Sequence, residues 1–103
     1  MEAVWTDDAI NWLNSLRDGQ AAGRISRRIQ TFEDVGRVFG DVHTVGGGVS
    51  EIRFQFGPGY RLYFAQKGNR LILLLIGGDK SSQERDIRKA QDLLNQLKES
   101  KQW

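Results

Sequence analysis

The fold of this chain is constrained most by one segment, in which an unbroken apolar run leads through two glycines to the capped start of a helix. Leu71–Ile76 is a run of six apolar residues, which indicates a strand covered on both faces. Gly77 and Gly78 follow, and they are expected to let the backbone turn sharply because glycine has no Cβ. Ser81 and Glu84 have the spacing of a capping box, so a helix is expected to begin there. The sequence therefore predicts a strand, a glycine turn and a helix in direct succession.

The end of this strand is a candidate anion site. Lys80 is expected to emerge at the edge of the sheet, beside the free N–H groups and the positive dipole end of the following helix. Such a place attracts phosphate groups. An ordinary connection in a mixed fold uses the same succession of elements. The segment is not a P-loop, because Asp79 precedes the lysine and the upstream glycine spacing of that motif is absent. Phosphate binding and a plain connection both remain open at this point.

Length and composition restrict the class of protein. A chain of 103 residues is expected to form one domain, residues 1–103, with room for one compact site. Without cysteine it has no disulfide, no thiolate nucleophile and no cysteine-type zinc site. Its longest apolar run is far shorter than the roughly 20 residues that span a bilayer, and its first residues lack a signal-peptide pattern. We expect a soluble, cytoplasmic protein with no membrane contact.

Basic residues are clustered although the formal net charge is only +2. One cluster falls in a helical region and another in a strand region that also contains tyrosines. Basic residues interleaved with aromatic ones suit a nucleic acid, whereas a solvated helix face and two basic hairpins are the alternative. The residues concerned are Arg24, Arg27, Arg28, Arg53, Arg61 and Tyr60.

The first half of the chain is typical of a short strand followed by two helices. Residues 3–5 are expected to form an edge strand, and Thr6 and Asp18 are expected to cap the two helices. Glycines at 36, 40 and 46–48 are expected to end the helical part. The expected apolar stripes are Ile10, Leu13 and Leu16 on the first helix, and Ala22, Ile25, Ile29 and Phe32 on the second.

The second half alternates with the period of strands. From Val49 onward, apolar residues on one face alternate with Glu51, Arg53 and Gln55 on the other. Turns at residues 57–59 and 67–70 join this strand to residues 60–65 and then to the apolar run, so Arg61 should share its face with Arg53. An antiparallel meander and an amphipathic last helix are therefore expected.

Together these elements predict an α+β fold with a helical hairpin packed on one face of an antiparallel sheet. The other face is expected to stay partly open. The strand arginines and Lys80 are expected to converge there in a concave, cationic, metal-independent site.

Two segments carry a resemblance to a known family. Gly57-Pro-Gly-Tyr-Arg-Leu-Tyr-Phe64 and Leu71-Ile-Leu-Leu-Leu-Ile-Gly-Gly-Asp-Lys-Ser-Ser-Gln83, followed by Asp86, Ile87 and Ala90, resemble the RelE/ParE toxin superfamily. The likeness is greatest to its HigB-like addiction-module killer branch, and it covers nearly the whole chain. The resemblance implies a RelE-like βααβββ core with a further helix, in a toxin of a bacterial type II toxin-antitoxin system.

The resemblance also implies an activity and partners. RelE-type toxins cleave mRNA on the ribosome without a metal or another cofactor: a 2′-hydroxyl attacks the adjacent phosphate and leaves a cyclic phosphate. The implied partners are the ribosome, mRNA and a cognate antitoxin, often a helix-turn-helix protein through which operator DNA is bound.

Site residues follow from the same motifs. Arg61 matches the arginine of the Tyr-Arg motif and is the first choice to stabilise the charged transition state. Lys80 matches a basic position after the next strand, and Arg53 would position a phosphate. Asp79 and His43 are the candidates for proton transfer, as in HigB-type relatives. Asp79 could equally fix the glycine turn, and a single histidine is often incidental.

The chain also departs from the RelE pattern. Glu51 stands where a basic residue is expected, and Ser81 and Ile87 stand where RelE has an arginine and a tyrosine. Tyr60 is a candidate platform for base stacking or for packing, and Arg24, Arg27 and Arg28 are candidates for binding RNA phosphates. The departures leave two alternatives to an endoribonuclease: a ParE-like inhibitor of DNA gyrase, and an inactive module that binds an antitoxin and serves autoregulation.

Overall fold

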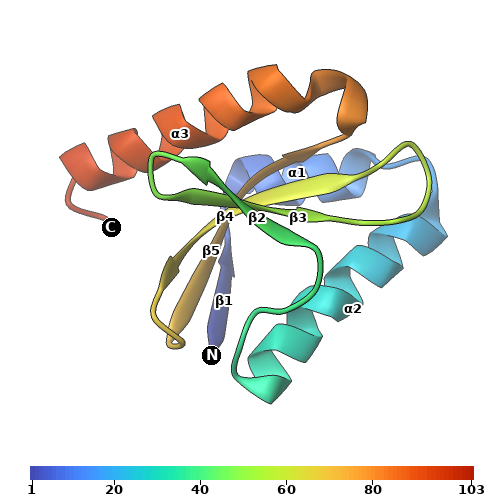
Figure 1. Cartoon of the computed structure of the whole chain (residues 1–103), viewed down its shortest axis with the longest axis horizontal. Helices are drawn as coiled ribbons and strands as arrows, with labels where there is room; N and C mark the ends of the chain where they lie inside the picture. The colour runs from blue at the N-terminus through green and yellow to red at the C-terminus, as the bar shows by residue number, and fades with distance from the viewer.

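The computed structural model describes residues 1–103 as a five-stranded sheet with helices on both sides. Figure 1 shows the elements in chain order. The α+β class and the final helix predicted from the sequence are confirmed. The strands are β1 (Glu2–Trp5), β2 (Val42–Gly46), β3 (Val49–Arg53), β4 (Arg61–Lys67) and β5 (Leu71–Gly78), and the helices are α1 (Asp7–Ser15), α2 (Gly19–Val35), the 3₁₀ turn η1 (Lys80–Ser82) and α3 (Gln83–Glu99).

The strand order in the sheet is β1-β5-β4-β3-β2. The expected edge strand is confirmed as β1, which pairs in parallel with β5, and the meander is confirmed as antiparallel β3, β4 and β5. The sequence did not reveal β2, which pairs with β3 in antiparallel orientation. Three successive glycines, Gly46–Gly48, connect the two strands. All three have positive φ angles, a conformation that glycine adopts without a steric penalty. These glycines therefore build a hairpin turn.

Both predicted helix caps are confirmed. The Thr6 side chain accepts a hydrogen bond from the Ala9 N–H, and the Asp18 side chain accepts from the N–H groups of Gln20 and Ala21. Helix α2 is capped at its C-terminal end by Gly36, which adopts the left-handed conformation. One residue of its buried stripe was predicted wrongly, because Ala21 is buried and Ala22 is only partly covered.

The prediction that helices cover only one face of the sheet is wrong. Helices α1 and α2 bury one face, around Ile25, Phe32 and Leu74. Helix α3 runs across the opposite face and packs Leu94 against a second cluster that includes Tyr63. Figure 1 shows α3 and α2 on different sides of the sheet. Because both faces are covered, β5 is buried on both sides as expected, and an open site must lie at the ends of strands or along the edges of the sheet. No helix of the chain has the length and apolar character needed to cross a membrane.

Gly77 and Gly78 do not form the predicted sharp turn. Both lie within β5, and neither has a positive φ. A Cβ on Gly77 would overlap the Trp12 ring, and a Cβ on Gly78 would overlap the Asp86 carboxylate. These glycines therefore allow α1 and α3 to approach the end of β5 from opposite faces. The capping box also differs from the prediction, since it is formed by Asp79 and Ser82 around η1.

Gly78→Ala is expected to lower the free energy of unfolding by about 1–3 kcal/mol, because the methyl group must displace the buried Asp86 carboxylate. Urea unfolding measures the change. The matched control is Gly23→Ala on the exposed side of α2, where a Cβ meets nothing within 4 Å. That substitution should be neutral or stabilise the helix by up to about 1 kcal/mol. Equal stability of the two variants would contradict the close-packing explanation.

Candidate functional site

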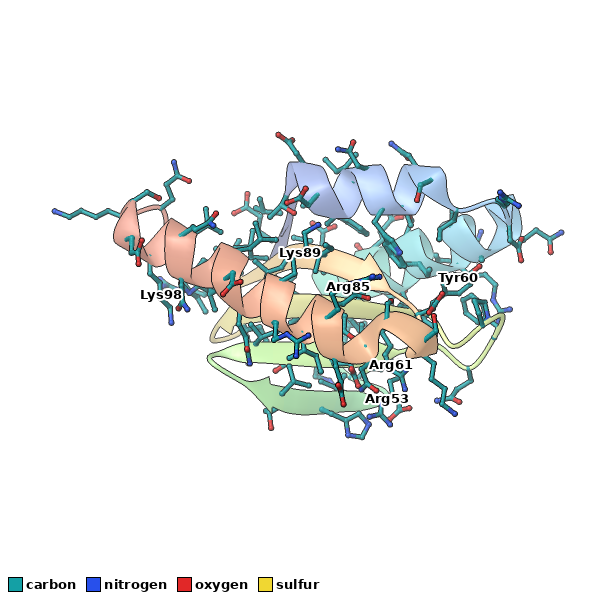
Figure 2. The ribbon with its side chains drawn as sticks, turned by 90° about the horizontal axis from the view of Figure 1, so that it is seen from above. Arg53, Tyr60, Arg61, Arg85, Lys89 and Lys98 are labelled. Atoms are coloured by element: carbon teal, nitrogen blue, oxygen red, sulfur yellow. The ribbon has the colours of Figure 1, made fainter.

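The two strand arginines lie opposite each other in the sheet. Arg53 ends β3, Arg61 begins β4, and the register pairs them directly, so both side chains leave the sheet on the same face, as predicted. Figure 2 shows both beneath the first turns of α3, with Tyr60 on the adjoining loop and Lys98 at the far end of the helix. The end of the sheet next to the start of α3 therefore carries two arginines side by side.

A fully buried carboxylate holds this pair of arginines. Glu51 is 0% exposed, and its two oxygens accept hydrogen bonds from Arg53 Nε at 2.6 Å and Gln83 Nε2 at 2.9 Å. Arg61 Nε lies 3.6 Å from the same carboxylate. Burial acts to raise the pKa of Glu51, but the bonds from Arg53 and Gln83 and the positive charges outweigh it, and the pKa is lowered. Glu51 is therefore an ionised anchor, and its departure from the RelE pattern has a structural explanation.

Arg61 is the most enclosed cation of the site. It is only 8% exposed, and its Nε and Nη1 atoms are buried without a hydrogen-bond partner. A buried donor without a partner is unfavourable, and the nearby Glu51 carboxylate supplies the counter-charge of this guanidinium. Arg61 lines a hollow of about 230 Å³ together with Arg53, Tyr60 and Lys80. The structure thus brings together four of the residues singled out in the sequence.

A second hollow of about 260 Å³ adjoins the first, since both are lined by Arg53 and Asp41. It adds Arg24 and Arg28 from α2, and the Arg24 guanidinium stacks 3.8 Å from the centre of the Phe56 ring. Two of the three predicted α2 arginines therefore extend the cationic surface. Arg27 is exposed and lines neither hollow.

The two candidates for proton transfer lie outside the lining of both hollows. His43 Nε2 lies 2.5 Å from Asp41 Oδ1, so the histidine is connected to the hollows through that carboxylate. Asp79 instead accepts hydrogen bonds from the Ser81 hydroxyl and N–H. The hydrogen bond from the Ser81 hydroxyl, together with those from the backbone N–H groups of Ser81 and Ser82, lowers the pKa of Asp79. Asp79 therefore fixes the turn that carries Lys80, and proton transfer by either residue stays a prediction.

Sequence reasoning missed Asp41 and Gln55. Asp41 lines both hollows and accepts a hydrogen bond from Gln55 Nε2 at 2.6 Å, in addition to its contact with His43. The Asp-x-His spacing could have indicated the pair, because residues two apart on an extended chain face the same side. This inference requires that the segment around His43 be recognised as a strand, and the sequence did not reveal β2.

Asp79→Ala is expected to lower the free energy of unfolding by about 1 kcal/mol, because the capping bonds of η1 are lost. Asp79→Ser supplies another capping oxygen without a charge. If the turn-fixing role is the important one, the serine variant should keep near-normal stability in urea. A serine variant as unstable as the alanine variant would instead show that the charge of the carboxylate is needed.

Comparison with known proteins supports the class suggested by the fold. Residues 11–95 match a family of toxins of type II toxin-antitoxin systems with RelE-like character. The chain belongs to this family, the Gp49-like phage-derived proteins. An uncharacterized protein of Haemophilus influenzae is 39% identical over 87 residues, which are 84% of this chain and 86% of that protein. No solved structure gives a significant match.

Proposed function

We propose that this toxin is a HigB-like, ribosome-dependent mRNA endonuclease that inhibits translation. The observation that carries the proposal is that three cationic residues from separate segments, Arg53, Arg61 and Lys80, line one hollow. A phosphodiester that gains charge during cleavage needs such donors, and arginine can hold two phosphate oxygens at once.

The proposed reaction is a transesterification. The 2′-oxygen attacks the adjacent phosphorus and loses its proton, the bond to the 5′-oxygen breaks, and that oxygen gains a proton. The products are a 2′,3′-cyclic phosphate and a 5′-hydroxyl. Arg61 stabilises the non-bridging oxygens, Arg53 positions the phosphate, and Lys80 stabilises the departing oxygen. The His43–Asp41 pair is the candidate proton acceptor because its carboxylate lines the hollow, and Asp79 holds the Lys80 turn.

The adjoining hollow supports a polynucleotide substrate. Arg24 and Arg28 offer charge for neighbouring phosphates, and Tyr60 and Phe56 offer rings on which bases can stack. Exposed Arg27 would add a contact to ribosomal RNA. We further propose that the toxin acts in the cytoplasm, where a cognate antitoxin with a helix-turn-helix domain neutralises it and links it to operator DNA.

Induced expression in bacteria tests this function. Incorporation of labelled amino acids should stop before RNA and DNA synthesis change, and mapping of RNA ends should place new 5′ ends inside translated messages. A reporter message without a start codon should escape cleavage if the ribosome is required. DNA damage with intact messages would favour the gyrase inhibitor, and unimpaired growth would favour the inactive module.

A further inference from the structure

Strand β1 is one of the two edge strands of the sheet, and its outer edge pairs with no other strand. Glu2 donates its N–H to the carbonyl of Arg70, directly before β5, and Thr6 donates its N–H to the carbonyl of Leu74 in β5. In a parallel ladder, this alternation directs the N–H groups of Ala3 and Trp5 toward the open side. The Ala3 N–H has a side-chain partner there, the Glu33 carboxylate of α2 at 3.2 Å. The edge thus presents backbone groups to which another strand can bind.

An apolar groove borders this edge on each face of the sheet. On the α1 and α2 side, Ile10, Leu13 and Ile29 line a groove of about 400 Å³. On the α3 side, a groove of about 480 Å³ is lined by Val4, Leu73, Leu97 and Trp103. Trp5 belongs to both linings, so the two grooves meet at the strand edge. Side chains of an added strand alternate between the two faces, and one groove is available to each set.

The charge of the grooves indicates the character of the added strand. Glu33 lines one groove and Asp7 the other, while no lysine or arginine lines either. Neither carboxylate forms an ion pair, in a chain whose basic residues outnumber its acidic ones. A complementary segment therefore carries apolar side chains together with lysine or arginine. When its backbone accepts the Ala3 N–H, Glu33 is released to pair with such a cation.

We propose that the cognate antitoxin adds an extended apolar and basic segment beside β1 as a sixth strand. The cationic hollows lie on β3, β4 and α2 and are lined by none of the groove residues, so neutralisation from this edge leaves Arg61 and Arg53 uncovered. The inference rests on the toxin-antitoxin family and is independent of RNA cleavage.

The test uses the full chain and the antitoxin encoded beside it. Val4→Lys and Ile10→Lys place a cation at side chains that are 40% and 41% exposed, so the fold should tolerate them. Each should weaken antitoxin binding at least about tenfold by calorimetry, because like charges meet across the interface. The matched control Val35→Lys changes a 54% exposed valine outside both grooves and should bind normally. Thermal unfolding verifies the fold of each variant.

Hydrogen exchange provides the second measurement. On binding of the antitoxin, the amide of Trp5 should exchange at least about tenfold more slowly, as expected for a new ladder bond. In cells, the Ile10→Lys variant should remain toxic when the antitoxin is supplied. Normal binding by both lysine variants, protection confined to the Arg61 hollow, or no binding of the antitoxin to the unmodified chain would each overturn the proposal. A toxin that binds in this way but leaves RNA intact would overturn only the proposed endonuclease function.

Discussion

Arg61→Ala is expected to reduce mRNA cleavage by about 10²- to 10³-fold while the chain still folds, because the variant loses a guanidinium that lines the proposed phosphate-binding hollow. The fold should persist since Glu51 keeps its hydrogen bonds from Arg53 and Gln83. Cleavage rates on a translated message, together with thermal unfolding, measure both effects.

Two further variants make this result specific. Arg61→Lys keeps the positive charge but loses the planar fork, so it should recover only part of the activity. Arg70→Ala removes an exposed arginine at the turn between β4 and β5, at the opposite end of these strands, and should cleave normally. A folded Arg61→Ala protein with full cleavage would show that the hollow is not the active site.

Glu51→Ala is expected to lower the free energy of unfolding by about 3–5 kcal/mol, because it leaves the buried Arg61 guanidinium without its counter-charge. Arg53, which is partly exposed, can turn to water and adds little to this cost. Since small domains are stable by about 5–15 kcal/mol, the variant should be close to unfolding. Urea unfolding measures the loss, and Glu99→Ala at the exposed end of α3 is the control. A loss no larger than that of the control would show that Glu51 does not anchor the arginines.

The lowered pKa of Glu51 also predicts how stability depends on pH. A carboxyl group with a lower pKa in the folded state stabilises the fold above its ordinary pKa of 4.5, and this contribution is lost as the pH falls through the folded value. Stability of the unmodified protein should therefore fall on acidification below about pH 5. Glu51→Gln should start from a lower stability at neutral pH and show a shallower fall. Parallel curves for the two proteins would contradict an ionised Glu51.

Features that depend on near neighbours in the chain could be predicted from the sequence. The caps at Thr6 and Asp18, the meander and the doubly buried β5 follow from residue type and period alone. The shared face of Arg53 and Arg61 followed from the turn at residues 57–59 between two alternating strands, whereas their direct pairing is seen only in the structure. Features that depend on distant elements were predicted wrongly, as the Gly77–Gly78 segment illustrates. These two positions require glycine because a Cβ would overlap the side chains of Trp12 and Asp86.

By itself, the sequence determined the fold class and which basic residues stand at the ends of strands, because the hydrophobic period and the turn residues are local properties. Only the tertiary structure decided that α3 covers the second face of the sheet, that Glu51 becomes the buried anchor of two arginines, and that Asp41 joins the two hollows. The physical reason is that burial and charge pairing depend on contacts between segments far apart in the chain. Glu51 and Gln83, for example, are 32 positions apart and share a hydrogen bond only once α3 has docked on the sheet.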